Sequence, residues 1–374
     1  MIMVGPWTLD QLAVAAGEPE QPIRRCIEMG LLHRRVDGDL EADSLHRLRL
    51  IQFARSRGFS DQQLADATVR QGDLLGIFEG LDPAGDAPAD LTGAARGVGL
   101  DDAVTDELAR ILDWEDPAAG TEADVALLDL VAQALDLGIP RDALMQIVRV
   151  FADTTDRLAD AVVRTFHNYV HDRFRAHGLV GPQLLEATRG VGRPALDLVE
   201  PFLVAFHRRA YQRANRQDLL RHLTEDATPP SSPTLGEEQA TVLFVDLASF
   251  TPLTATMGDH AAANVLGRFS ATARSSATRH AGRILKQIGD AFMLMFTHPV
   301  DAIEFGLTMS RFVDTEPQFP ALHIGAHHGT VLYREGDYVG GTVNLAARVA
   351  SAGAAGQFLI TNDLRHAAGV IADA

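Results

Sequence analysis

The fold of the C-terminal part of the chain is decided by the stretch Arg283-Ile284-Leu285-Lys286-Gln287-Ile288-Gly289-Asp290-Ala291-Phe292-Met293-Leu294-Met295-Phe296. Its two apolar halves, residues 283–288 and 291–296, have the length of strands. The pair Gly289-Asp290 between them is typical of a tight turn. The stretch therefore predicts a β-hairpin with a carboxylate at its tip.

Lys286 is the only lysine of a chain that has 33 Lys and Arg residues in all. Chance alone could place it in this strand. Its position four residues before Asp290 also indicates a need for a compact ammonium group, where the planar guanidinium of arginine would not fit. The second interpretation gains weight because two dense motifs, residues 244–251 and 336–348, lie on either side of the hairpin.

The sequence around the hairpin alternates between short apolar runs and helical periodicity. We expect strands over residues 240–247, 321–327 and 357–361, and helices over residues 259–280, 300–313 and 342–351. With the hairpin, the order is β-α-β-β-α-β followed by α-β. This order is typical of a ferredoxin-like core with additions.

The sequence before residue 224 has helical periodicity almost throughout. Apolar spacing predicts helices over residues 126–137, 141–176 and 194–223, and the Gly/Pro/Asp-rich residues 80–99 predict a loop. We therefore predict the fold class α+β. Its expected parts are a helical, winged-helix-like subdomain over residues 1–80, a helical bundle over residues 81–223, a Pro/Ser-rich linker over residues 224–238, and an α+β domain over residues 239–374.

The charge of the chain excludes some function classes. The 374 residues carry a net charge of −17, and residues 240–374 hold 9 Lys and Arg against 11 Asp and Glu, so residues 1–239 carry −15 of it. So acidic a chain is a poor general binder of nucleic acid or anionic membrane. A single cysteine, Cys26, excludes an intramolecular disulfide. With no membrane span or signal peptide in the pattern, we expect a cytoplasmic protein.

Residues 1–70 resemble the winged helix-turn-helix start of MerR-type regulators, notably in Glu28-Met29-Gly30-Leu31-Leu32. Such a region either contacts DNA or has kept only the helical scaffold. Residues 1–70 hold 9 Arg against 10 Asp and Glu. Because DNA-binding domains gain affinity by neutralising phosphates, we expect no nucleic-acid partner.

Two carboxylates follow apolar strands and are candidates for a metal site. Asp246 ends the strand over residues 240–247, and Asp290 lies at the hairpin tip. In the split βαβ order these strand ends are neighbours. Each Asp alone is better explained as a turn or cap residue. Together they form a hard-oxygen site for Mg²⁺ or Mn²⁺, and two such ions could clamp a triphosphate and activate a hydroxyl.

The segment Leu247-Ala248-Ser249-Phe250-Thr251 precedes a predicted helix, so its backbone N–H groups could cradle phosphates. We name Leu247, Phe250 and Thr251 as candidates for this contact. The alternative is an ordinary helix start, since Thr251-Pro252 favours one. This signal is weaker than that of the two carboxylates.

Asn344 and Arg348 are four residues apart on the predicted helix over residues 342–351, so they share one face. The alternative is a solvated helix surface. The rest of this helix is apolar, and an Arg in such surroundings needs a partner. A phosphate that gains charge in a transition state would be one.

These motifs together resemble class III nucleotidyl cyclases over about residues 238–367. The resemblance implies metal binding by Asp246 and Asp290, purine selection by Lys286 and Asp337, ribose orientation by Asn344 and transition-state stabilisation by Arg348. Members of the family that use GTP carry Glu and Cys at the selecting pair. Lys with Asp therefore implies ATP, because Lys can donate to adenine N1 and Asp can accept from the 6-amino group.

The implied activity is an adenylate cyclase that converts ATP to 3′,5′-cyclic AMP and pyrophosphate, with two Mg²⁺ or Mn²⁺ ions per site. The family builds each site from two chains, with the metal ligands from one and the other residues from its partner. This chain holds both sets, so the resemblance implies a homodimer with shared active sites. It also leaves open which basic residue binds the terminal phosphates, because the chain has no lysine besides Lys286.

The helical N-terminal part resembles the regulatory domain of two-domain actinobacterial cyclases, which autoinhibits and responds to acidic pH. The resemblance implies regulation by pH and a lipid as a further ligand. His207 and His222 near the linker are candidates for the titrating groups. His167 and His171 are either a metal pair or a plain helix face. The rival hypothesis is a transcription regulator with a degenerate cyclase domain, which the intact motif set and the acidic N-terminus disfavour.

Overall fold

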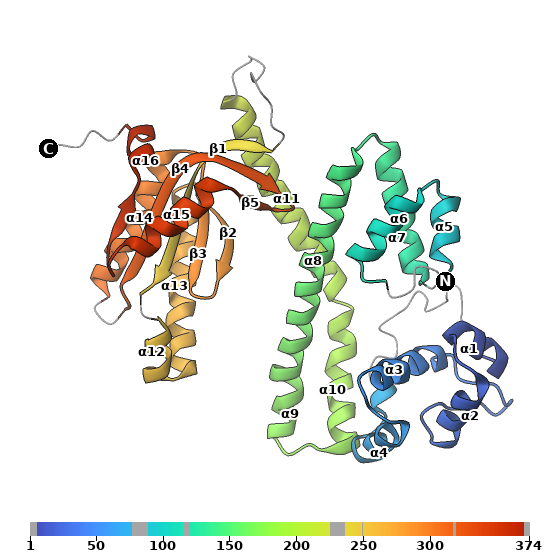
Figure 1. Cartoon of the computed structure of the whole chain (residues 1–374). Helices are drawn as coiled ribbons and strands as arrows, with labels where there is room; N and C mark the ends of the chain where they lie inside the picture. Colours follow the sequence, from blue (N-terminus) through green and yellow to red (C-terminus); the bar gives the residue numbers. More distant parts are fainter. Residues whose placement is uncertain are drawn as a thin grey trace. The chain divides into compact units, whose positions relative to one another are not determined.

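A computed structural model of the chain describes residues 6–76, 89–114, 120–224, 236–248, 250–316 and 319–369. The chain divides into two compact units, residues 1–227 and 228–374. The first unit is helical, and the second combines helices with one sheet (Figure 1), so the predicted fold class α+β is confirmed. Among the described residues, no helix combines the length and apolar composition that crossing a membrane requires.

The sheet of the second unit has the strand order β2-β3-β1-β4-β5, and β6 pairs with β4. The strands are β1 (Glu237–Leu247), β2 (Arg283–Ile288), β3 (Ala291–Phe296), β4 (Leu322–Arg334), β5 (Asp337–Val339) and β6 (Phe358–Ile360). The neighbours β2, β3, β1 and β4 pair antiparallel, as in the predicted ferredoxin-like core. The hairpin has its predicted bounds. Most of the predicted linker lies outside the described residues, and its last two residues belong to β1 instead.

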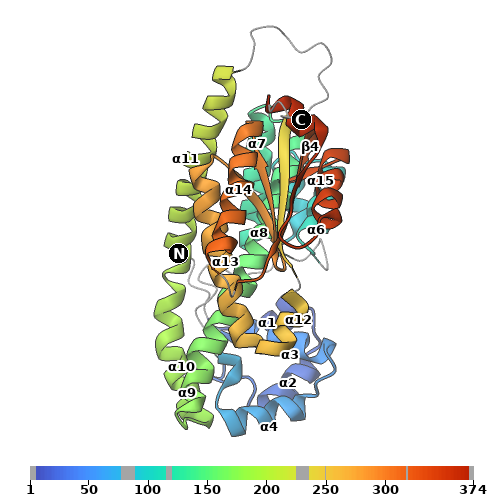
Figure 2. The ribbon, with the colours of Figure 1, turned by 90° about the vertical axis from the view of Figure 1, so that its left-hand side faces the viewer.

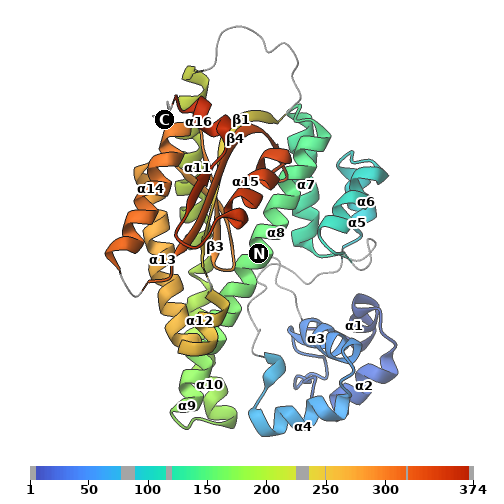
Figure 3. The ribbon, with the colours of Figure 1, turned by 60° about the vertical axis from the view of Figure 1, so that its left-hand side comes forward.

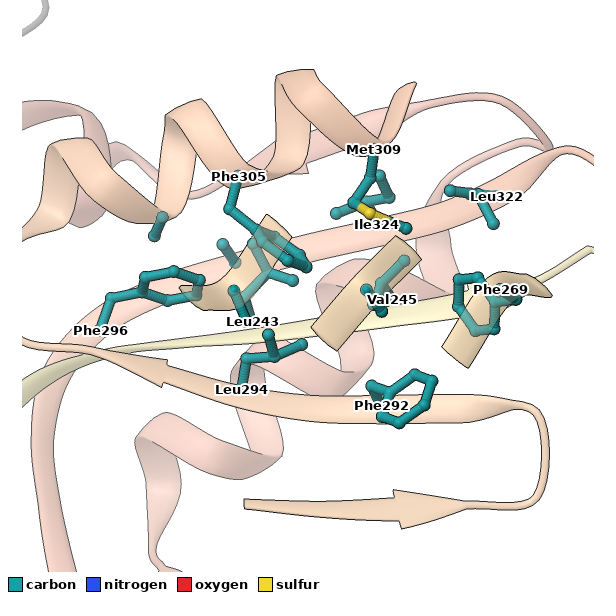
Figure 4. Packing of buried hydrophobic residues seen from close by; sticks show 14 of the residues in the cluster. Leu243, Val245, Phe269, Phe292, Leu294, Phe296, Phe305, Met309, Leu322 and Ile324 are labelled. Atoms are coloured by element: carbon teal, nitrogen blue, oxygen red, sulfur yellow. The ribbon is translucent and has the colours of Figure 1, made fainter. Parts of the chain in front are cut away.

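Helices cover both faces of this sheet. They are α12 (Phe250–Met257), α13 (Asp259–Arg279), α14 (Pro299–Thr315), α15 (Gly341–Ala352) and α16 (Asn362–Ala367). Figure 2 shows α13 and α14 on one side of the strands and α15 on the other. Phe269 of α13 and Phe305 of α14 reach the core between these helices and the strands (Figure 4). A second buried cluster, which includes Met293 and Ala346, fills the α15 face.

Strand alternation decides which side chains of β1 reach which face. Leu243 and Val245 are buried in the α13 and α14 core. Successive side chains of a strand point to opposite faces, so Val242 and Asp246, on either side of this pair, point to the α15 face. On that face α15 lies close to β4 at Gly325, where a Cβ would lie 2.0 Å from the Ala350 backbone N. A glycine is therefore needed there for the helix to approach the sheet.

The first unit contains helices α1 (Leu9–Ala16), α2 (Glu20–Glu28), α3 (Ser44–Ser56), α4 (Asp61–Gln71), α5 (Leu91–Gly97), α6 (Asp102–Ile111), α7 (Glu122–Asp136), α8 (Arg141–Phe166), α9 (Asp172–Ala176), α10 (Gly181–Leu196) and α11 (Val199–Thr224). A five-residue π-helical stretch joins α8 to α9. Helices α1 to α4 gather around one small core (Figure 3), and α5, α6 and α7 with the start of α8 enclose another.

Two predictions for this unit are wrong in part. The predicted helix over residues 194–223 starts too early, because α10 takes Pro194 into its last turn and the helix breaks only after Leu196. Of the predicted loop over residues 80–99, residues 80–88 lie outside the described part. The rest contains α5, whose start is capped by Asp90 accepting from the Gly93 N–H at 2.9 Å. Two of the seven residues of this helix are glycines, whose low helix propensity explains why the sequence predicted a loop there.

His167 and His171 lie in the π-helical stretch with their rings stacked, centroids 5.0 Å apart. His171 Nδ1 also lies 3.3 Å from Thr188 Oγ1 on α10. Within the described ranges, no third His, Cys, Asp or Glu joins the pair in a metal-holding group.

Candidate active site

The two predicted metal ligands lie side by side at one end of the sheet. In the β1–β3 ladder Asp246 pairs with Ala291, the residue that follows Asp290. Asp290 itself stands in the tight turn between β2 and β3, where Gly289 supplies a φ of 62°. Burial raises the pKa of Asp246 above its ordinary value, and the negative charge of Asp290 raises it further. The pairing of β1 with β3 thus brings two carboxylates together against their mutual repulsion.

Asp246 has an oxygen that is suited to a cation. Its Oδ1 atom is buried and has no hydrogen-bond partner among the described residues. Within the same residues, no group of three or more His, Cys, Asp and Glu side chains could enclose a metal ion. Mg²⁺ commonly takes only one or two protein carboxylates, and substrate phosphates and waters complete its shell. The donor set therefore fits Mg²⁺ or Mn²⁺ that arrives with a phosphate ligand.

A neighbour of Asp246 was not predicted. His323 of β4 stands directly across from Asp246 in the β1–β4 ladder, and its Nδ1 atom lies 3.1 Å from the Gly353 carbonyl oxygen. The positive charge of a protonated His323 counteracts part of the rise in the pKa of Asp246. Only the strand register could have identified this histidine, because the two residues are far apart in the sequence.

Lys286 and Asp337 form a direct ion pair, with Lys286 Nζ donating to Asp337 Oδ2. The other carboxylate oxygen of Asp337 accepts a hydrogen bond from the Tyr338 N–H at 2.8 Å. Both charged side chains remain more than one third exposed, 38% for Lys286 and 40% for Asp337. The pair therefore combines fixed geometry with access for a ligand that could exchange hydrogen bonds with it.

Asn344 and Arg348 lie on the outer side of α15 and are both exposed. Ala346 and Ala350 form the inner side of the helix against the sheet. Arg348 makes no ion pair with any described residue. The described residues thus supply no ion-pair partner for this Arg, and both side chains are exposed on the helix surface.

The predicted phosphate cradle is described only in part. The Leu247 N–H donates to the Asp246 carboxylate. Phe250 starts α12, while Ser249 and the side chain of Thr251 lie outside what the structure describes. The cradle therefore stays a prediction.

The structure brings the predicted residues together in three groups: Asp246 with Asp290, Lys286 with Asp337, and Asn344 with Arg348. Asp246 points to the face of the sheet that α15 covers, and α15 carries the third group. No hydrogen bond or ion pair joins one group to another among the described residues. Each group offers a different kind of contact. Asp246 and Asp290 could bind a cation, Lys286 and Asp337 could exchange hydrogen bonds with a flat ring, and Asn344 and Arg348 provide an amide and a guanidinium.

Residues 234–368 match the family model of the adenylate and guanylate cyclase catalytic domain. This match confirms the predicted resemblance to class III cyclases over the C-terminal part of the chain.

Curated relatives extend the similarity beyond this domain. A protein of Mycobacterium tuberculosis (strain CDC 1551 / Oshkosh) named pH-sensitive adenylate cyclase is 27% identical over 272 residues, covering 70% of this chain and 64% of that protein. An adenylate cyclase of Streptomyces coelicolor is 28% identical over 267 residues, covering 69% of this chain and 66% of that protein. The matches thus span slightly less than two thirds of these relatives. Because the matched domain supplies only about half of such an alignment, the similarity reaches into the helical unit.

Solved structures with partial similarity are also cyclases. The adenylyl cyclase CyaB from P. aeruginosa is 25% identical, with a TM-score of 0.32, and the match covers 35% of this chain and 80% of that one. A guanylyl cyclase domain of the RhoGC fusion protein from Blastocladiella emersonii is 22% identical, with a TM-score of 0.33, and the match covers 36% and 85%.

Proposed function

We propose that the chain is an adenylate cyclase that converts ATP to 3′,5′-cyclic AMP and pyrophosphate, under the control of its helical unit. In this reaction the ribose 3′-oxygen forms a bond to the α-phosphorus while the bond from that phosphorus to pyrophosphate breaks in line. The hydroxyl proton is released. The observation that carries the choice of ATP is the ion pair between Lys286 and Asp337.

Asp246 and Asp290 would hold the divalent cations. Bound Mg²⁺ or Mn²⁺ would lower the pKa of the 3′-hydroxyl and offset the charge of the triphosphate. The buried, unpartnered Oδ1 atom of Asp246 supports this role, because an orphaned carboxylate oxygen gains most from a hard cation. The carboxylates themselves fix the position of the triphosphate relative to the sheet.

Lys286 and Asp337 would recognise the adenine ring. An ammonium can donate to N1 and a carboxylate can accept from the 6-amino group, whereas guanine presents the opposite polarity at both positions. Both groups are already aligned with each other, so adenine would find a donor and an acceptor preset at adjacent points.

Asn344 would orient the ribose, and Arg348 would stabilise negative charge on the α-phosphate. Their exposure on the outer side of α15 supports a site that a second subunit completes. We infer a homodimer in which one chain contributes Asp246 and Asp290 and its partner contributes the base, ribose and phosphate contacts.

Regulation by pH is the second part of the proposal. The relative in M. tuberculosis is named pH-sensitive, and the alignment with it includes helical residues. Within the helical unit, His207 of α11 lies edge-on to Phe151 of α8 with ring centroids 5.9 Å apart, and His222 lies 3.3 Å from Asp218. A charge on these rings would change the packing of α8 on α11 and the electrostatics of α11. The lipid ligand stays a prediction of the resemblance.

The activity is tested by incubating the full chain with ATP and Mn²⁺ and measuring cyclic AMP and pyrophosphate in equal amounts. GTP in place of ATP is the substrate control. Production of cyclic GMP at a similar rate would contradict the assignment to ATP. If ATP and GTP bind but neither cyclic AMP nor cyclic GMP forms, the rival hypothesis of a ligand sensor would be favoured.

The shared site is tested by mixing two inactive chains, Asp246→Ala and Arg348→Ala. A heterodimer of these two has one site with both lesions and one site with neither. We expect about one quarter of the wild-type activity, because random mixing makes half of the dimers heterodimers and each has one intact site of two. Continued inactivity, with heterodimers shown to form, would mean that each site belongs to one chain.

A further inference from the structure

Tyr338, the residue after Asp337, is held from two sides in the core of the α15 face. Its side chain is only 5% exposed. The Arg283 guanidinium lies over its ring, with Cζ 5.0 Å from the ring centroid. Its hydroxyl donates a hydrogen bond to the Glu238 carboxylate, and burial together with this carboxylate raises the pKa of Tyr338 to about 12. A buried tyrosine with both its ring face and its hydroxyl engaged has little freedom to move.

Arg283 can reach this ring because β2 is irregular. Arg283 pairs with Met295 and Lys286 with Met293, two residues that belong to the α15 face, and the register shifts between Ile284 and Lys286. In a regular strand, two residues three apart would point to opposite faces. The bulge at this point therefore places the Arg283 and Lys286 side chains on the same face, as bulges beside functional sites commonly do.

The same tyrosine also fixes the acidic partner of Lys286. The Tyr338 backbone N–H donates to Asp337 Oδ1, while Lys286 donates to Asp337 Oδ2. β5 contains only three residues, so its pairing with β4 cannot alone hold Asp337 firmly. The buried ring of Tyr338 supplies the missing anchor.

We infer that Tyr338, clamped between Arg283 and Glu238, is the positioning residue that sets Asp337 against Lys286 and thereby the preference for adenine over guanine. The inference rests on the proposed function, in which Lys286 and Asp337 contact the base. It adds residues from β1, β2 and β5 that do not touch the nucleotide. Discrimination between two bases depends on donors and acceptors held within a fraction of an ångström, so a loosened β5 lowers discrimination before it lowers turnover.

A purely structural role would give a different result. A core tyrosine that only stabilises the unit would, when weakened, reduce the amount of folded protein and lower the use of ATP and GTP by the same factor. A positioning role changes the ratio of the two nucleotides and KM more than kcat. The ratio is independent of the folded fraction, so it separates the two roles.

The experiment uses the full chain with Arg283→Met and Tyr338→Phe. Arg334→Met and Tyr333→Phe are the matched controls. Arg334 is 66% exposed on the β4–β5 hairpin. The Tyr333 ring lies 5.1 Å from the Tyr338 ring, and Tyr333→Phe keeps this ring contact and removes only a hydroxyl. KM and kcat are measured for ATP and GTP with Mn²⁺. Calorimetry with α,β-methylene-ATP and α,β-methylene-GTP gives affinities that do not depend on cyclisation. Arg283→Lys is the conservative variant, since an ammonium can also stack on the ring.

We expect Arg283→Met to lower the preference for ATP over GTP by a factor on the order of ten, mainly through KM for ATP. Tyr338→Phe should lower it by a few fold, and Arg283→Lys should restore part of the loss. The controls should keep the wild-type preference. Equal losses for both nucleotides, or an unchanged preference in Arg283→Met, would overturn the inference. A wild-type chain that binds ATP without cyclising it would refute the proposed function, while the binding ratio would still decide the role of Tyr338. A chain that binds neither nucleotide would refute both.

Discussion

The sheet of the second unit and the long helices of the first differ in how they cover their apolar side chains. In β3, Phe292, Met293 and Leu294 have no exposed surface at all. In contrast, α8 and α11 are 26 residues long each, yet α8 buries only Leu144 and Met145. Large apolar side chains on α8 and α11 are exposed: Ile147, Phe151, Leu158, Val162, Val163, Phe202, Leu203, Val204, Phe206, Tyr211 and Leu219.

The difference indicates that the two units cover their apolar side chains to different degrees. Each face of the sheet has helices of the same unit packed on it, so the second unit carries its own core. Both long helices have large apolar side chains that the described residues of their own unit leave exposed, and exposed apolar surface of this extent marks a place for an interaction. Their conformation therefore depends on the surface that covers them, which is the property a regulatory element needs.

The largest effect is expected when the carboxylate pair of the second unit is broken. Asp246→Ala or Asp290→Ala should each lower activity about a thousandfold, because the bound cations are expected to lower the activation free energy by several kcal/mol. Asp314→Ala, at an exposed position on α14, is the control and should retain wild-type activity. Thermal unfolding and calorimetric titration with Mn²⁺ accompany the assay. Activity within about tenfold of wild type in either variant would refute the metal role.

The contrast in burial itself is tested by two substitutions of the same kind. Phe269 is fully buried and lies against Phe292 with centroids 5.3 Å apart, whereas Phe206 is 66% exposed. Phe269→Ala should lower the free energy of unfolding of the second unit by about 3–5 kcal/mol. Phe206→Ala should change that of the first unit by less than about 1 kcal/mol. Urea unfolding with a separate probe in each unit measures both. A similar loss for Phe206→Ala would show that a partner surface covers the helix in solution.

A smaller effect is expected at the base-selecting pair. Lys286→Glu with Asp337→Cys should lower kcat/KM for ATP about a hundredfold, because each lost hydrogen-bonding partner costs on the order of 1–3 kcal/mol. The gain for GTP should be smaller, because a new guanine fit needs further supporting groups. Steady-state kinetics with both nucleotides provide the test, and Arg334→Met again controls for the hairpin. Unchanged ATP turnover would refute the role of the pair.

The elements that were predicted well are those with a strong local signal. The hairpin has its predicted bounds because its two apolar runs and the Gly-Asp turn between them favour the same structure. The strand predicted over residues 321–327 is longer, and β4 continues to Arg334. Its second half contains His328, Gly329 and Thr330, whose strand conformation comes from pairing with β1 and not from propensity.

The features that were missed depend on register and on tertiary contacts. His323 faces Asp246, and Arg283 reaches Tyr338, only because of how the strands pair and where β2 bulges. The break between α10 and α11 was placed wrongly because Pro194 is tolerated in the last turn of a helix. Arg348 was expected to need a partner, and the described residues supply no ion pair to it.

We expect acid to lower both the stability and the activity of the second unit, because His327, His328 and Asp246 have shifted pKa values. Burial lowers the pKa of His327 and of His328, so each binds a proton less readily in the folded unit than in the unfolded chain, where a histidine has a pKa near 6.5. Unfolding then takes up protons, and the stability is complete above about pH 6.5 and declines as the pH falls below it. The raised pKa of Asp246 has a parallel effect on activity, because protons compete with the cation for this carboxylate.

The smallest and most informative effect is therefore a difference between two pH profiles. Residues 225–374 alone should lose activity steadily from about pH 7 to about pH 5.5, because only the second unit responds. The full chain should gain activity by a few fold over the same range, since protonated histidines in the helical unit shift it away from the inhibiting packing, and that shift needs only a few kcal/mol. The two profiles are measured with saturating Mn²⁺, and His207→Gln in the full chain should flatten the gain without changing activity at pH 8. Parallel profiles would mean that the helical unit is a scaffold, and that whatever covers α8 and α11 does not respond to protons.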